Sequence, residues 1–462
     1  MLLTEFRERG TWFIPGLENK VVFSGDIIYS PVKGIKLELI PIPKSSDPDF
    51  FQISKDLTKC KFMYGKLMTG EFVTLYDTFA LQMPIFPYKS YKYHANFGFI
   101  GEDYLKDDEL NFKSFLLKLN ILTSWFFLKG LNLKIRPPFK IKEVGFENEE
   151  LTFELDFAIF ELGNFWKQSF SHQYFRVEAE TYIRFHYKEN ANLQSLLKTV
   201  YQIQILLSLI GGKNFYPSSL GAETSTGKKV DILYSFYVGE DYNQEVHWNR
   251  FLFNFRMISD FSKILKNYFN SLKEIEIVYD LFYEYRFRRK ILEEEFLNIV
   301  RALEVYHRIK FGGSVLPDDI FSVLLKEIES TIQIKIRELK IQNIDQDQLR
   351  NLIPRYANEP NLNKRLKELY SFLKNIGFVK NLLGGNKKKV KNFLYKVSLS
   401  RNYYTHFNPD LKDKALRGID LYWTNKKLGA FLEILLLKEI GFQDTEIDSA
   451  VSQNLDYTQL LH

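Results

Sequence analysis

An arginine and a histidine stand five positions apart in the stretch SLSRNYYTHFNPD, residues 398–410. RNA carries its own nucleophile, the 2′-OH, so its cleavage requires a base, an acid and a group that stabilises the negative charge on the phosphate. Histidine is the residue type most often used as acid or base in such chemistry, which makes His406 a candidate, and the guanidinium of Arg401 can stabilise the charge. These residue types are compatible with RNA cleavage that needs no metal and no cofactor, so the stretch is a candidate catalytic site. The alternative for so short a motif is the polar end of an ordinary helix.

The spacing of the two residues has two consequences. On an ideal helix Arg401 and His406 point about 140° apart. We therefore expect the helix to be distorted or to end near His406, because Asn408 precedes Pro409 and is pushed out of the α conformation. A single motif also supplies only one histidine per chain. A two-fold dimer, or a higher even oligomer, would join two motifs in one cleft and provide both an acid and a base.

A basic run leads into this pair. Between residues 380 and 401 the chain has seven lysines or arginines and no aspartate or glutamate. Cations for phosphates and aromatic rings for bases are the composition of an RNA-contacting surface. The residues predicted to bind the RNA substrate are Lys387, Lys388, Lys389, Lys391, Lys396, Tyr403 and Tyr404. The alternative is that the run is only a solvated helix face.

A second helix is predicted in EEEFLNIVRALEVYHRIKFGG, residues 293–313. Glu304 lies four residues after Val300, on the apolar side of this helix. Because burying an unpaired carboxylate costs folding free energy, we expect Glu304 to have a partner from another helix, and Arg401 is one candidate. His307 lies one turn further on the same side. Glu304 and His307 are thus predicted to support the site; the alternative is a pair of side chains with solvated tips.

The composition is that of an ordinary globular protein. The chain has 462 residues, of which 45% are hydrophobic and 26% are charged, and its net charge is +6. The only cysteine, Cys60, excludes an internal disulfide and a structural cysteine–zinc site. The first residues lack the order of a signal peptide, and charges interrupt every apolar run. We expect a cytoplasmic protein without membrane contact.

The chain changes its periodicity near its middle. Alternating apolar and charged residues predict antiparallel strands in the first half, most clearly over 175–186. From residue 249 onward almost everything has helical spacing, including the apolar stripe that begins at Leu428. The prediction is an α+β multidomain protein. A β-rich, sandwich-like sheet module over residues 1–245 precedes an all-α helical bundle over residues 246–462.

The combination of modules resembles the HEPN superfamily, and within it the ApeA-like anti-phage proteins. The resemblance rests on R-x4-H preceded by the helix FLNIVRALEVYHR, and on RGTWFIPGLENKVVFSGDIIYSPVKGIKLELI near the start. It leaves residues 60–280 without support.

The resemblance implies metal-independent RNA cleavage in antiviral defence, often by abortive infection. The family's arginine, its adjacent polar residue and its histidine fall on Arg401, Asn402 and His406. We expect the β-rich half to be a sensor that keeps the nuclease off until it meets a trigger such as a phage-derived protein. Two other functions stay open: a non-catalytic HEPN module that binds nucleic acid or protein, and a dimerisation scaffold.

Overall fold

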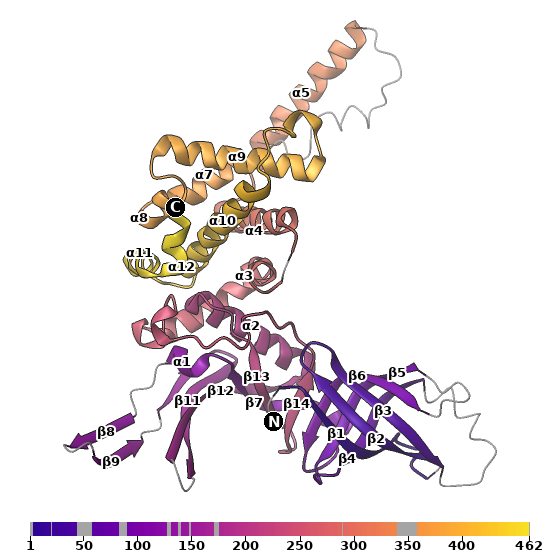
Figure 1. The fold of residues 1–462 in the computed structure, drawn as a ribbon. Helices are drawn as coiled ribbons and strands as arrows, with labels where there is room; N and C mark the ends of the chain where they lie inside the picture. Colours follow the sequence, from indigo (N-terminus) through magenta and orange to yellow (C-terminus); the bar gives the residue numbers. More distant parts are fainter. Residues whose placement is uncertain are drawn as a thin grey trace. The chain divides into compact units, whose positions relative to one another are not determined.

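The computed structural model describes most of the chain. The described ranges are 3–19, 21–43, 58–82, 90–126, 131–136, 140–146, 149–170, 175–288, 290–339 and 358–461. Within them the first half is rich in strands and the second half is helical, which confirms the predicted fold class (Figure 1).

Six strands of the first half close into a barrel. They are β1 (Phe6–Phe13), β2 (Val21–Ser30), β3 (Gly34–Pro43), β4 (Lys59–Leu67), β5 (Phe72–Gln82) and β6 (Tyr91–Gly101). Each pairs antiparallel with two others, and the pairing of β6 with both β3 and β5 closes the ring. The barrel interior is apolar and includes fully buried Trp12, Phe23 and Tyr93.

An open antiparallel sheet continues from the barrel. Its strands are β7 (Asn111–Leu119), β10 (Glu150–Glu154), β11 (Ala158–Phe170), β12 (Phe175–Asn192), β13 (Pro217–Thr224) and β14 (Lys229–Tyr234), and β14 joins it to β6. A separate hairpin consists of β8 (Leu131–Arg136) and β9 (Lys140–Phe146). The alternating stretch 175–186 lies in β12, as predicted. The sheet module is thus a barrel that opens into a sheet.

Helices and aromatic residues cover one face of the open sheet. α2 (Leu193–Gly211) begins at Asn192, whose side chain accepts a hydrogen bond from the Ser195 amide, and ends at Gly212 with a positive φ of 63°. The indole of Trp125, in α1 (Leu122–Phe126), donates to the Phe253 carbonyl at 2.8 Å. Its ring packs against Phe261. α2 is the one described helix with the length and apolar composition to cross a membrane, and 67% of it is buried inside the protein.

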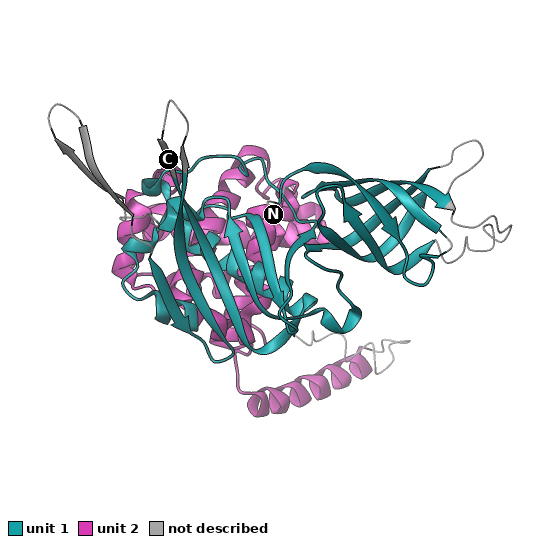
Figure 2. Cartoon of the chain, turned by 90° about the horizontal axis from the view of Figure 1, so that it is seen from below, with its two compact units in different colours: residues 1–266 teal, residues 267–462 magenta. Residues whose placement is uncertain are grey.

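The described chain forms two compact units, residues 1–266 and 267–462 (Figure 2). They divide inside α3 (Phe261–Phe287), whereas the sequence places the change of class at 245–246. The intervening segment contains two short 3-10 helices, η3 (Trp248–Arg250) and η4 (Phe255–Met257). It packs with the first unit because the Leu252 amide bonds to the Gly211 carbonyl at 2.8 Å and Phe251 packs on Phe215.

The second unit is a helical bundle. After α3 come α4 (Leu292–Phe311), α5 (Asp318–Glu338), α7 (Leu362–Phe372), α8 (Gly377–Leu382), α9 (Lys387–His406), α10 (Gly418–Glu439), α11 (Asp444–Gln453) and α12 (Leu455–Thr458). Three further 3-10 turns are η2 (Asp107–Glu109) in the first unit, and η5 (Pro409–Leu411) and η6 (Gln459–Leu461) in this one. The predicted stripe from Leu428 to Leu436 is fully buried in α10, which packs against α4.

Candidate active site

The motif lies on the last two turns of α9. This helix begins at Asn386, whose side chain accepts a hydrogen bond from the Lys389 amide, and ends at His406. Phe407 then adopts a left-handed conformation, φ 50° and ψ 35°, and its amide donates to the Tyr403 carbonyl at 2.6 Å. Asn408 is extended before Pro409, as the sequence predicts. His406 is therefore an exposed side chain at a helix end.

Glu304 of α4 holds Arg401 in place. The Nη2 atom of Arg401 donates to both carboxylate oxygens of Glu304, at 2.9 and 3.1 Å, and Nη1 donates to the Asn402 side chain at 3.4 Å. The pairing considered from the sequence is thus present. Both side chains keep partial exposure, 30% for Arg401 and 19% for Glu304. Since a guanidinium has five N–H donors, Arg401 retains donors for an anion while its orientation is restrained.

The segment after α9 is tied back onto the helix. The hydroxyl of Ser400 accepts a hydrogen bond from the Leu416 amide at 2.9 Å, and the hydroxyl of Tyr404 donates to the Leu416 carbonyl at 2.6 Å. Burial raises the pKa of Tyr404. Arg417, next along the chain, stacks on the ring of Tyr403 at 5.2 Å. These contacts set the path of the chain beside His406.

The predicted RNA-binding residues fall into two groups. All five lysines are exposed. By helical spacing Lys388, Lys391, Tyr395, Asn402 and His406 share one solvent-facing side of α9, over about 27 Å.

The two tyrosines differ from the lysines. Tyr404 is only 9% exposed, and its hydroxyl is engaged by Leu416, so the structure gives it a positioning role. Tyr403 is partly exposed beneath Arg417. Arg417 and Ser400 were not singled out from the sequence. The signal for Ser400 was a small polar residue on the buried side of α9.

His307 occupies a different environment from Glu304. It is 1% exposed, and its Nε2 lies 2.6 Å from a carboxylate oxygen of Glu368 in α7. Arg365 donates to its Nδ1 at 3.5 Å, which leaves the proton on Nε2. Burial lowers the pKa of His307. The structure therefore places His307 in the core between α4 and α7, away from solvent.

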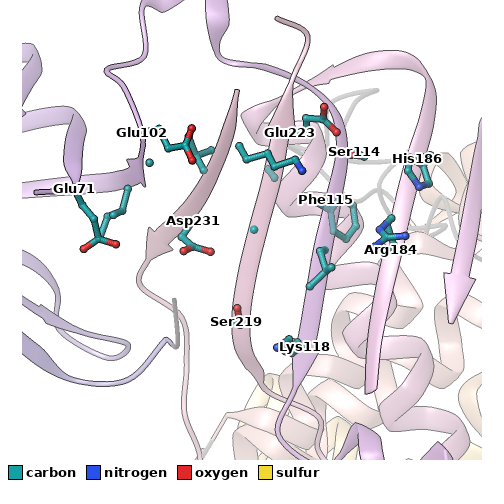
Figure 3. Close-up of a pocket in the computed structure, with 17 residues that line it drawn as sticks. Glu71, Glu102, Ser114, Phe115, Lys118, Arg184, His186, Ser219, Glu223 and Asp231 are labelled. Atoms are coloured by element: carbon teal, nitrogen blue, oxygen red, sulfur yellow. The ribbon is translucent and has the colours of Figure 1, made fainter. Parts of the chain in front are cut away.

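A second candidate site is an open hollow of about 690 Å³ in the first unit. Figure 3 shows Glu71, Glu102 and Asp231 at one side of it, with Arg184 and His186 of β12 at the other. The hollow lies over the solvent face of the open sheet where the barrel begins. Sequence reasoning missed it because its lining comes from strands distant in the chain.

The basic side of this hollow is held by acidic neighbours. Glu161 of β11 pairs with Arg184 at 3.1 Å and with His186 at 3.4 Å. Lys118 of β7 pairs with Glu180. Each of these three side chains therefore has a carboxylate partner on an adjacent strand, which makes this a rigid polar surface.

Other reactive groups are sparse in the described part of the chain. Burial raises the pKa of the Cys60 thiol to about 11, so it is a poor nucleophile. No group of three or more His, Cys, Asp or Glu side chains among the described residues is arranged to hold a metal ion.

The residues matched by two family models correspond closely to the two compact units of the chain. Residues 297–446 match the Apea-like HEPN model, so the helical half is a HEPN domain. Residues 7–268 match ApeA N-terminal domain 1. The chain belongs to the ApeA family: it is an ApeA-like protein with a C-terminal HEPN domain. No significant match was found among curated proteins or solved structures.

Proposed function

We propose that this protein is an anti-phage defence ribonuclease that cleaves RNA without a metal and causes abortive infection. The observation that carries the proposal is the end of α9, where Glu304 orients Arg401 and where His406 is exposed. The family adds support, because HEPN domains are generally associated with RNases and the N-terminal domain is of the ApeA type.

The reaction proceeds by internal transfer. The 2′-oxygen attacks phosphorus as a histidine takes its proton; the bond from 2′-oxygen to phosphorus forms and the bond from phosphorus to the 5′-oxygen breaks. A second histidine protonates the leaving 5′-oxygen. The products are a 2′,3′-cyclic phosphate and a 5′-OH. Arg401, and Asn402 beside it, stabilise the charge on the phosphate oxygens.

The need for two histidines favours a homodimer. We propose that this dimer acts in the cytoplasm. Each chain contributes one His406, and a two-fold axis near the motif would bring two copies of Arg401 and His406 around one phosphate. The exposed side of α9 that runs from Lys388 to His406 would guide the RNA strand toward this cleft.

The direct test is total cellular RNA after induced expression. We expect cleavage by the wild type and none by His406→Ala, with His247→Ala as the matched control because His247 is also exposed but lies in the first unit. Products should carry 2′,3′-cyclic phosphate ends, and EDTA should leave the purified activity unchanged. Equal cleavage by His406→Ala would contradict the site, and restoration by Mg²⁺ after EDTA would contradict the metal-independent mechanism.

A binding or dimerisation module is the second candidate. It is favoured by exposed apolar residues directly after the motif and at the start of α10: Phe407 at 70%, Ile419 at 67% and Trp423 at 43%. RNA that is bound but never cleaved, equally by the wild type and His406→Ala, would support this alternative.

We propose that the β-rich unit is the sensor and that a phage-derived protein is its trigger. The hollow with Arg184 and His186 supplies a rigid charged surface for such recognition. We expect Arg184→Ala combined with His186→Ala to abolish RNA degradation after phage infection, while exposed Lys33→Ala, on the loop between β2 and β3, should have no effect. Unchanged timing of RNA degradation in the double variant would refute a role for the hollow.

A further inference from the structure

α5 is an amphipathic helix whose apolar side is not covered by the part of the chain that the structure describes. The helix spans Asp318–Glu338, and Val323, Leu324, Ile328 and Ile332 recur along it. None of its residues is buried. Leu324 is 40% exposed and Ile328 is 45% exposed, and α5 extends away from the bundle of its own unit (Figure 1).

Six apolar residues of α5 and its end form one seam. At about 100° per residue they lie within roughly a third of the helix circumference. They are Phe321, Leu324, Ile328, Ile332, Ile336 and Leu339. An apolar seam of this width on a soluble helix is the pattern of a helix that packs on another helix.

The six residues are placed symmetrically about residue 330, whereas Leu325 and Lys335, which fall on the same side of the helix, exchange places under that symmetry and do not match. From Phe321 the steps to Leu324 and Ile328 are three and four residues; from Leu339 backward the steps to Ile336 and Ile332 are also three and four. Ser330 lies at the centre, on the opposite side of the helix. A two-fold axis perpendicular to the helix at residue 330 would therefore place Phe321 of one copy beside Leu339 of the other.

The charges have the same two-fold complementarity. The first turn carries Asp318 and Asp319, and the last turn carries Lys335 and Arg337 together with Glu338, which pairs with Lys335 at 2.6 Å, so that the end of the helix keeps a net charge of +1. When two copies run antiparallel, the acidic start of one helix lies near the basic end of the other, and the helix dipoles are also opposed favourably. A parallel arrangement would bring like charges together at both ends.

We propose that α5 pairs with α5 of a second copy of this chain as a short antiparallel coiled coil centred on residue 330. The occupant is a second copy because the seam and the end charges are each complementary to themselves. This contact is separate from the motif on α9 and does not depend on RNA cleavage. Where both contacts form between different copies, the assembly is a higher even oligomer.

The first test is the mass of the full-length protein in solution. We expect Ile328→Asp to weaken self-association at least about tenfold and to halve the mass over about 1–100 µM. Ser330→Asp is the matched control, with the same new charge on the opposite side of the same helix, and it should keep the wild-type mass. An equal mass for the wild type and Ile328→Asp at every concentration would overturn the proposal.

The second test fixes the direction of pairing. Chains with Phe321→Cys and chains with Leu339→Cys, distinguished by tags of different size, are mixed and oxidised; Cys60 is buried and stays in both. We expect the mixed cross-link between positions 321 and 339. In a parallel pair these positions would lie about 27 Å apart, so a predominance of 321–321 cross-links, or the absence of cross-links, would refute the antiparallel arrangement.

Other occupants give different results. If the first unit of the same chain covers the seam, Ile328→Asp lowers the melting temperature without changing the mass. If the seam binds lipid, the wild type co-sediments with phosphatidylglycerol vesicles and Ile328→Asp does not. Either result, with an unchanged mass, would contradict pairing of two copies.

Discussion

Two sites in the helical unit combine an arginine, a histidine and a glutamate, and they differ in burial. At the end of α9, Glu304 binds Arg401 while His406 is exposed. Between α4 and α7, His307 is buried and hydrogen-bonded. The guanidinium of Arg365, beside it, is 2% exposed and donates to Glu359 and to the Pro360 carbonyl.

The difference is that between a structural role and the chemical role that we propose for the exposed set. In the buried set the histidine has a partner at each nitrogen, so it stabilises the packing of α4 against α7 and has no nitrogen left for a substrate. In the exposed set the arginine is oriented and the histidine is accessible. Among the described residues, His406 has no hydrogen-bond or ion-pair partner, which leaves both ring nitrogens available for proton transfer.

The largest expected effect is the loss of RNA cleavage on substitution of His406, which distinguishes it from His307. His406→Ala should lower RNA cleavage by about 10²–10⁴-fold, because general acid–base catalysis contributes that much. Its free energy of unfolding should change by less than about 0.5 kcal/mol, since the side chain is exposed. Cleavage of a labelled RNA and denaturant unfolding measure the two quantities. A folded His406→Ala protein with wild-type cleavage would remove the distinction between the two sites.

His307→Ala should show the reverse behaviour. The substitution leaves a cavity and removes a hydrogen-bond partner from Arg365, so we expect a loss of about 2–3 kcal/mol in the free energy of unfolding. Cleavage per folded molecule, assayed well below the melting temperature, should stay close to the wild type. A large loss of cleavage without a loss of stability would instead give His307 a part in the chemistry.

Glu304→Gln should have a moderate effect on activity. The variant keeps the shape of the side chain but weakens its hold on Arg401, and we expect about a tenfold loss of kcat with a stability change below about 1 kcal/mol. Glu368→Gln, the corresponding change beside His307, should leave cleavage unaffected. If the two variants lose activity equally, Glu304 is no more than a surface ion pair.

The smallest expected effect is a pH dependence of the free energy of unfolding that is caused by the lowered pKa of His307. Burial lowers its pKa in the folded protein, so near pH 6.5 the unfolded chain binds a proton that the folded chain does not. The stability is therefore complete above pH 6.5 and falls as the pH drops below it, by at most about 1.4 kcal/mol per pH unit. Denaturant unfolding from pH 8 to pH 5 should show a shallower slope in His307→Ala, but the wild-type slope in His406→Ala. Identical slopes in all three proteins would contradict the assignment.

The sequence by itself determined the local features of this protein. Alternation over 175–186 predicts β12, helical spacing predicts the buried stripe of α10, and Asn408 before Pro409 predicts that the helix is distorted or ends near His406. A cationic partner for Glu304 was also expected, with Arg401 as one candidate, because a carboxylate on an apolar helix face is seldom left unpaired. Each of these depends on neighbours within a few residues or on a single charge balance.

Only the tertiary structure decided which faces are covered and which strands meet. Helical spacing places Glu304 and His307 on one side of α4, yet α7 buries His307 while Glu304 stays at the edge of α9. The same spacing predicts the seam of α5 but not that it lies uncovered. The closure of the barrel through the pairs β1–β4 and β3–β6, and the hollow beside Arg184, depend on pairings between strands that are not consecutive in the chain. The periodicity of the sequence predicts which side of a helix or strand is apolar. Which other element packs against that side depends on the tertiary structure of the whole unit.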